Sequence, residues 1–308
     1  MRLRQAPLAT RLAAQAVKRL PMGRYRLAHM LSRNPPPPFW AQLPWSVGGA
    51  RFVCDLRDGI AREVFFTGRY EPQETALVRH LLRPDAVFVD VGANWGYFTL
   101  LAANLVGPNG RVVALEPEPR CHTALVENVS ENGMDNVTVL ALAASDGDGY
   151  LALQGYDAAL ENYGTSRIVF STDGETGMIQ VKARRLDDAL DDLGLPRVDL
   201  AKMDIEGSEG AALAGLGRSL AAGRIERLIV ELHSSRLSEL GSSPEEVVEQ
   251  VVAAGYIAWR IDHSPAATRA TAYASEPDPK RLITSLEQSD PLDEWPHLLF
   301  VREGSEPV

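Results

Sequence analysis

The sequence predicts an α/β protein built on a doubly wound, mostly parallel sheet. From residue 87 onward, short apolar runs alternate with segments of helical periodicity, which is the pattern of successive strand–helix–strand units. The apolar runs are nearly continuous, as expected of parallel strands that helices cover on both faces. The 308 residues, 45% of them hydrophobic and 23% charged, suit one globular domain with appendages.

The N-terminal segment is predicted to be separate from this domain. Residues 1–45 are expected to form a basic helical extension and a proline-rich linker, and residues 46–308 the domain itself. Residues 1–34 contain eight Arg or Lys residues and no acidic residue. Apolar residues at four-residue steps predict an amphipathic helix over 6–20, and the prolines that begin at Pro35 end the helical region. We expect this helix to pack on the protein itself; contact with an anionic membrane surface is the second interpretation.

The elements of the domain are expected in the following order. Residues 50–66 are predicted to form two short strands joined at an Asp-Gly turn, and residues 71–82 a helix. Seven strands of the main sheet follow, the last two as a hairpin-like pair. These strands are expected at residues 86–92, 111–117, 137–145, 198–207, 224–233, 256–262 and 297–303.

Two segments interrupt the alternation of strands and helices. Residues 147–186 contain three short runs of strand type and are predicted to form an antiparallel β insertion. Residues 264–294 are predicted to be a long polar loop, and connections of that length commonly cover or line a binding site.

Charge and cysteine content exclude some partners. The net charge is −10 and the basic residues gather at the N-terminus, so the acidic remainder repels phosphates and no nucleic-acid partner is expected. Cys54 and Cys121 form no disulfide framework and fit a reducing cytosol. No apolar run has the length of a membrane span and no secretory signal is evident. We therefore expect a cytoplasmic protein, peripheral to the membrane if residues 1–34 bind lipid.

One turn carries the strongest binding signal. A strand ends at Asp90, and a turn through Gly92, Asn94 and Gly96 leads into a helix. Such a turn brings backbone amides and a helix N-terminus close to a ligand at the carboxyl edge of the sheet. Glu116 ends the next strand, where a carboxylate suits the hydroxyls of a ribose. Together these features predict a cofactor that contains adenosine.

The carboxylate of Asp90 helps to choose between such cofactors. A nicotinamide site usually shows Gly-x-Gly-x-x-Gly, and a carboxylate beside the turn would repel a pyrophosphate. The same carboxylate suits a ligand with an ammonium or sulfonium group, which favours S-adenosylmethionine. A nicotinamide-dependent oxidoreductase and a non-catalytic binding module on the same fold are the alternatives.

At these motifs the chain resembles the FkbM family of S-adenosylmethionine-dependent methyltransferases. The resemblance rests on FVDVGANWGYFTLLAA, VVALEPEPRCHTALVENVSEN and DLAKMDIEGSEGAALAG, and it covers roughly residues 60–233. It implies a class I methyltransferase (Rossmann-like) fold and methylation of a hydroxyl on a sugar, glycan or polyketide-type natural product. It also implies that the turn after Asp90 holds the methionine half of the cofactor and that Glu116 takes the ribose.

Five further residues are expected near the cofactor or the acceptor. Ser145 and Asp146 follow the third strand, where this fold usually contacts adenine; a plain turn explains them equally well. Glu71 opens a helix that is expected over the methionine end, although an acid at a helix N-terminus is favourable without any ligand. Asn162 and Tyr163 resemble a segment of the family's insertion and are expected to line the acceptor pocket.

Acidic residues and a histidine end the fourth and fifth strands. O-methylation requires removal of the hydroxyl proton, by a general base or by a metal ion that acidifies the hydroxyl. Asp204 is the first candidate, as the base or as a ligand of Mg²⁺ together with Glu231. His233 is the second candidate base, with a neutral helix-entry residue as the alternative. Glu206 is expected to contact the acceptor, and the other histidines show no metal-ligand spacing.

Overall fold

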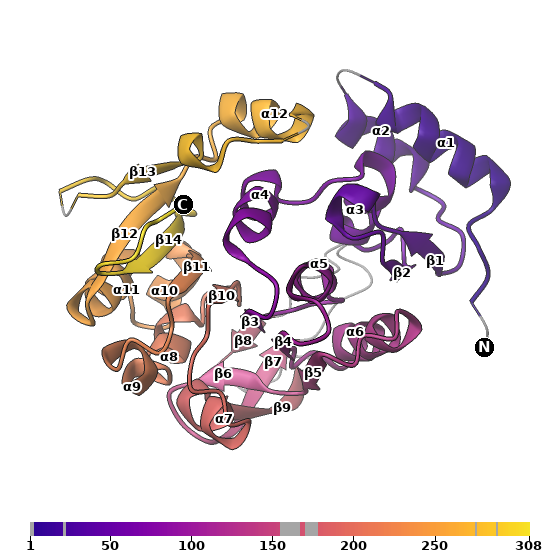
Figure 1. Ribbon diagram of the computed structural model, residues 1–308. Coiled ribbons are helices and arrows are strands. Elements are labelled where there is room, and N and C mark those ends of the chain that lie inside the picture. The colour runs from indigo at the N-terminus through magenta and orange to yellow at the C-terminus, as the bar shows by residue number, and fades with distance from the viewer. Residues whose placement is uncertain (1–2, 21–22, 155–166, 170–177, 275, 288) are drawn as a thin grey trace.

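The centre of the molecule is an eight-stranded sheet. The structure is a computed structural model that describes residues 3–20, 23–154, 167–169, 178–274, 276–287 and 289–308. The strand order is β13-β12-β14-β11-β10-β3-β4-β5 (Figure 1). The strands are β3 (Val87–Val91), β4 (Arg111–Leu115), β5 (Val137–Leu140), β10 (Leu200–Met203), β11 (Arg227–Glu231), β12 (Tyr256–Ile261), β13 (Ile283–Ser285) and β14 (His297–Arg302).

The direction of the strands confirms the predicted fold class. Strands β5, β4, β3, β10 and β11 run parallel to one another. Strand β14 lies antiparallel between β11 and β12, which is the expected hairpin-like pair. All seven expected strands are therefore present, and β13 adds an eighth at the edge.

Helices cover both faces of this sheet because its side chains alternate between two apolar cores. In β3, Phe88 belongs to the core beneath α4 and α5, whereas Val89 and Val91 belong to the core beneath α7, α8 and α11. The helices are α1 (Leu8–Lys18), α2 (Arg24–Leu31), α3 (Gly59–Thr67), α4 (Pro72–Leu81), α5 (Tyr97–Val106), α6 (Pro119–Glu131), α7 (Leu186–Asp192), α8 (Glu209–Ala214), α9 (Gly217–Ala221), α10 (Ser234–Glu239), α11 (Pro244–Ala253) and α12 (Pro265–Tyr273).

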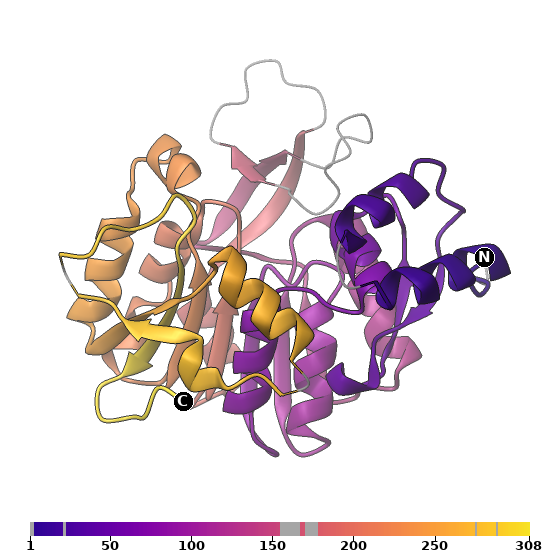
Figure 2. The ribbon, with the colours of Figure 1, turned by 90° about the horizontal axis from the view of Figure 1, so that it is seen from above.

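The predicted β insertion is present as a separate sheet. Strand β7 (Gly149–Gln154) lies antiparallel between β8 (Arg167–Val169) and β9 (Met178–Arg185). Figure 2 shows these strands to one side of the main sheet. The third strand of the main sheet is shorter than predicted, because β5 ends at Leu140. Residues Ala143–Ser145 form a separate strand, β6, which pairs with β9.

Two further predictions of local structure are wrong. The Asp-Gly pair was expected to turn a hairpin, but the Asp58 side chain accepts a hydrogen bond from the Ala61 amide and caps α3. The preceding strand, β2 (Arg51–Cys54), pairs instead with β1 (Phe39–Gln42). The long connection at residues 264–294 is not a plain loop, since it contains α12, a 3₁₀ turn at Pro279–Arg281 and β13.

The N-terminal helices pack against the body of the protein. Ala14 and Val17 of α1 and Ala28 of α2 are buried in the same core as the inner residues of α3. Figure 1 shows α1 and α2 beside α3. The buried side of α1 is not the predicted one, because Leu8 and Leu12 are 68% and 56% exposed. Within the described residues, no helix combines the length and apolar character that crossing a bilayer requires.

Candidate active site

A cavity of about 410 Å³ opens at the carboxyl ends of β3, β4 and β10. Its walls include the turn after β3, the acid that ends β4, and the residues just after β10. Because parallel strands end at one edge of a sheet, these segments meet although they lie far apart in sequence. The lining residues that concern the prediction are Asp90, Gly92, Asn94, Glu116, Asp204 and Glu206.

Gly92 is required by the close approach of β3 and β10. Its φ is +84°, and a Cβ atom there would lie 2.0 Å from the carbonyl oxygen of Asp204. Asn94 also has a positive φ of +52°, and Gly96, with a φ of +98°, precedes the first turn of α5. The predicted turn therefore places bare backbone at the wall of the cavity.

Asp90 and Glu116 are buried carboxylates beside this turn. Asp90 accepts a hydrogen bond from the hydroxyl of Thr99 at 2.6 Å, and burial raises the pKa of Asp90 to about 6. The two oxygens of Glu116 accept hydrogen bonds from the amides of Asn94, at 2.7 Å, and Glu118, at 2.8 Å. Burial raises the pKa of Glu116 to about 7. The amides fix the Glu116 carboxylate at the cavity wall.

Part of the cavity wall is apolar. Leu142, Ala143 and Ala144 line it, which provides a surface of the kind that a purine ring needs. Sequence analysis missed these residues because it extended the third strand through them. Among the described residues, the predicted adenine contacts Ser145 and Asp146 are not part of the lining; the Ser145 hydroxyl lies 3.2 Å from the Asp146 carboxylate.

Lys202 is a functional candidate that sequence analysis missed. Its ammonium group lies 3.3 Å from Asp204 Oδ2 and 3.4 Å from Glu71 Oε2, and 4.6 Å from the centre of the Phe98 ring. Burial alone would lower the pKa of Lys202, but the carboxylates of Glu71 and Asp204 outweigh it and raise the pKa. The sequence feature that could have identified Lys202 is a lysine within an apolar parallel strand, because a buried charge needs partners of opposite charge.

Glu71 lies where the sequence suggested, at the start of α4. It has a φ of +38°, an uncommon conformation for a residue with a side chain. Its carboxylate is mostly buried and faces Lys202. Burial raises the pKa of Glu71, while the neighbouring ammonium group of Lys202 opposes that shift. Lys202 lines the cavity and thus joins the start of α4 to β10, whereas Glu71, which was predicted to contact the cofactor, is not among the described lining residues.

His233 lies behind this rim, among three carboxylates. Its Nδ1 is 3.3 Å from Glu209 Oε1, and its Nε2 is 3.4 Å from Glu206 Oε2 and 3.6 Å from Glu231 Oε1. Burial lowers the pKa of His233, but the hydrogen bond to Glu209 and the charge of Glu206 raise it to about 9. A protonated ring has no free lone pair to accept a proton, so the raised pKa of His233 argues against its predicted role as a base.

The pair predicted to bind Mg²⁺ is brought together. Asp204, Glu231 and His233 each offer a donor atom, and these atoms lie within 4.8 Å of one another. The expected acceptor residue Glu206 lines the cavity and forms an ion pair with Arg236. The other expected acceptor residues, Asn162 and Tyr163, lie outside the described residues.

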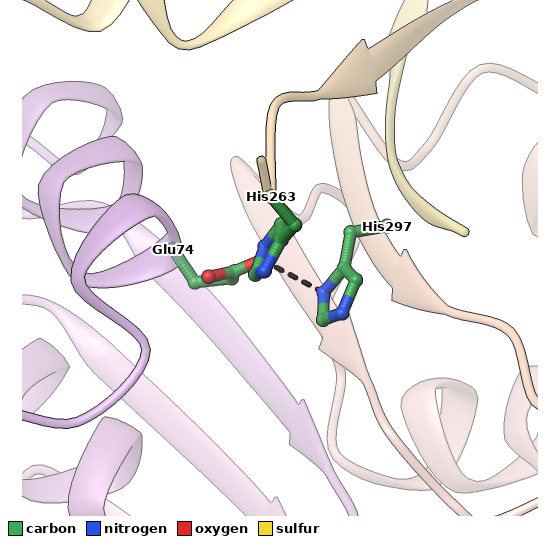
Figure 3. A group of neighbouring side chains, drawn as sticks. All are labelled: Glu74, His263 and His297. Carbon is green, nitrogen blue, oxygen red and sulfur yellow. Dashed lines mark hydrogen bonds and ion pairs between the residues drawn. The ribbon is translucent and has the colours of Figure 1, made fainter. Parts of the chain in front are cut away.

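A second cluster adjoins this one and was not predicted. Glu74 of α4 meets His263, which follows β12, and His297, which begins β14 (Figure 3). His297 Nε2 also lies 3.7 Å from Glu231 Oε1, so the two clusters are neighbours. The sequence contains no motif that predicts this cluster, because its residues come from three separate elements.

Known proteins share the part of the chain that builds the cavity. The profile of the methyltransferase FkbM domain matches residues 90–258, which is more than half of the chain. The 2-O-methyltransferase NoeI of Sinorhizobium fredii is 28% identical over 150 aligned positions, and the alignment covers 45% of this chain and 60% of NoeI. The hexuronic acid methyltransferase AglP of Haloferax volcanii is 27% identical over 179 aligned positions, and the alignment covers 57% of this chain and 66% of AglP. The chain thus spans less than two thirds of either relative.

A solved structure that carries the name of this domain also aligns with the chain. Methyltransferase FkbM from Methylobacillus flagellatus KT has a TM-score of 0.41 and 16% sequence identity. The alignment covers 94% of this chain and 58% of that one.

Proposed function

Because this chain belongs to the FkbM methyltransferase family, we propose that it methylates a hydroxyl oxygen with S-adenosylmethionine as the methyl donor. The observation that carries the proposal is the cavity at the carboxyl edge of the sheet. It combines a glycine turn, the buried Asp90 beside it, the anchored Glu116 and an apolar wall. This is the class I methyltransferase arrangement that the sequence predicts.

The chain's own residues suit each part of this cofactor. Glu116 presents carboxylate oxygens for the ribose hydroxyls, and Leu142 to Ala144 offer an apolar surface for adenine. Asp90 and the other carboxylates at the rim favour a ligand with positive charge, which S-adenosylmethionine carries on its sulfonium and ammonium groups. When bound, the cofactor supplies an electrophilic methyl group.

Asp204 is our proposed general base. Its side chain is 21% exposed at the cavity and Lys202 holds the carboxylate in place. From this position Asp204 accepts the hydroxyl proton of an acceptor, while Glu206 contacts the acceptor beside it. His233, charged by its three carboxylate neighbours, holds Glu206 and Glu231 instead of accepting the proton.

The cluster of Asp204, Glu231 and His233 supports a second form of this proposal. In this form, Asp204 and Glu231 would hold a Mg²⁺ ion, which would supply Lewis-acid activation of the acceptor hydroxyl. The two forms differ in one measurement, since a chelator abolishes activity that depends on Mg²⁺ and leaves direct base catalysis intact.

The acceptor class follows from the relatives by analogy. NoeI is a 2-O-methyltransferase and AglP a hexuronic acid methyltransferase, so we propose a sugar, glycan or related small molecule. We further propose a cytoplasmic protein whose basic residues 1–34 touch an anionic membrane surface, near a lipid-linked acceptor. The exposed Leu8 and Leu12, one turn apart on α1, support this surface contact.

The test of the proposed reaction is transfer of a tritiated methyl group from S-adenosylmethionine to a panel of sugars, glycans and polyketides. We expect transfer to at least one class, lowered about 10²-fold or more in Asp204→Asn. The exposed Glu239→Gln is the matched control and should leave the rate unchanged. Cofactor binding without transfer to any acceptor would favour the non-catalytic module, and binding of NADH in its place would favour the oxidoreductase.

A further inference from the structure

The cluster of Glu74, His263 and His297 has no part in the proposed reaction. None of the three is among the described residues that line the cavity. Glu74 Oε1 lies 2.6 Å from His263 Nε2 and 2.9 Å from His297 Nδ1 (Figure 3). Three elements that are distant in sequence therefore present their polar atoms to one point.

We propose that Glu74, His263 and His297 bind one divalent transition-metal ion, with Zn²⁺ as the best match. Two imidazole nitrogens and one carboxylate oxygen are a common donor set for this ion. One donor atom from each residue lies within 4.8 Å of the others. Three protein ligands leave a fourth position for water, as in open zinc sites.

The burial of Glu74 points to a missing partner. Glu74 is 1% exposed, and its Oε2 atom is buried without a hydrogen-bond partner among the described residues. A buried carboxylate oxygen with no partner is costly, because it has lost its hydration. Oε1 already faces the two imidazole nitrogens, and an ion bound by this carboxylate would also give Oε2 a partner. The His263 side chain is 30% exposed, which gives an ion a route from solvent.

The arrangement of the two imidazole rings is more compatible with one shared metal ion than with protonation of both rings. They stack with centroids 3.6 Å apart and planes 15° apart. Two protonated rings at that separation would repel each other, so both cannot be charged at once. A divalent ion satisfies both nitrogens and the carboxylate together. Because ring lone pairs lie in the ring plane, one ring tilts out of the stack when the ion binds.

The surroundings of His297 resemble those of a metal ligand. Its second nitrogen, Nε2, faces Glu231 Oε1 at 3.7 Å. Histidines that bind metal usually present their other ring nitrogen to a carboxylate or carbonyl, which orients the ring. A bound ion would tie α4 to β12 and β14, and so hold Glu71, at the start of α4, beside Lys202. The role of this ion would be structural and distinct from methyl transfer.

Calorimetric titration of the full chain with ZnCl₂, after removal of metal by a chelator, tests the site. We expect one ion per chain, with affinity at least 10-fold weaker in His263→Asn and Glu74→Gln. Glu231→Gln should weaken binding by about 10–100-fold, as outer-shell partners do. Two controls should bind as the wild type does: the exposed His29→Asn, and Asp204→Asn, which disables the other cluster. Circular dichroism verifies that each variant is folded.

X-ray absorption at the zinc edge of the wild-type complex tests the ligands without any substitution. A shell with two imidazole rings supports the proposal, and a shell of oxygen alone overturns it. The proposal also fails if the wild type does not bind Zn²⁺, or if His263→Asn and Glu74→Gln bind it unchanged. Loss of the ion in Asp204→Asn, with retention in His263→Asn, would place the ion at the other cluster and would equally overturn it.

Discussion

Replacement of Lys202 by methionine tests how the acidic rim is held together. Lys202 is 5% exposed and is the cation between Glu71 and Asp204. Methionine fills a similar volume but leaves both carboxylates without this partner. Removing one partner of a buried ion pair costs about 3–5 kcal/mol. For a chain of 308 residues we therefore expect the melting temperature to fall by about 5–8 °C.

The pH dependence of this loss identifies its cause. Burial already raises the pKa of Glu71, and raises the pKa of Glu231 to about 8. A carboxyl with a raised pKa in the folded state costs stability as the pH rises, because the unfolded chain releases its proton first. Without Lys202 these pKa values rise further. The deficit of Lys202→Met should therefore be largest near pH 8 and should shrink toward pH 5.

Thermal melting by circular dichroism between pH 5 and pH 8 measures both effects. The exposed Lys182→Met is the control for loss of a positive charge, and its melting temperature should stay near that of the wild type. Adding Glu71→Gln to Lys202→Met should recover part of the lost stability, since it removes one of the stranded charges. The reasoning is refuted if Lys202→Met melts within about 2 °C of the wild type, or if its deficit is equal at both pH values.

Three further predictions concern the turn, its carboxylate and the N-terminal helix. Gly92→Ala should lose about 2–5 kcal/mol of stability and its cofactor binding, because the new Cβ meets the Asp204 carbonyl at a positive φ; unchanged melting and calorimetry would contradict this. The affinity for S-adenosylmethionine should fall as the pH drops from 8 to 5, since burial raises the pKa of Glu116 to about 7 and that of Asp90 to about 6, and protonated Asp90 does not attract a cation. In Asp90→Asn the part of the fall near pH 6 should be absent and the part near pH 7 should remain; an unchanged pH profile would contradict this. The full chain should co-sediment with phosphatidylglycerol vesicles in low salt, and the double variant Leu8→Ser, Leu12→Ser should bind the vesicles more weakly. If the wild type does not co-sediment, the membrane contact is rejected.

The sequence was informative where structure is local or periodic. The apolar runs predicted the strands of the main sheet, and the turn after Asp90 together with Glu116 predicted where the cavity opens. Both depend on short-range rules, namely the burial of parallel strands and the freedom of glycine. The assignment failed at Asp58, because the side chain of an Asp-Gly pair can cap a helix as well as turn a hairpin.

The parts that could not be predicted depend on tertiary contacts. Glu74, His263 and His297 meet only because α4 packs near the ends of β12 and β14. The sequence shows Lys202 only as one residue of a strand, and its role becomes visible only when the structure brings Glu71 and Asp204 beside it. The raised pKa of His233 likewise depends on carboxylates from separate positions, namely Glu206, Glu209 and Glu231.

The most direct test of the central claim is calorimetric titration with S-adenosylhomocysteine, comparing the wild type with Glu116→Ala. We predict micromolar binding by the wild type, about 10–100-fold weaker binding by Glu116→Ala through loss of hydrogen bonds to a charged group, and no change in the exposed control Glu127→Gln. Absence of binding by the wild type, or equal affinity in Glu116→Ala, would contradict the assignment of this cavity as the cofactor site.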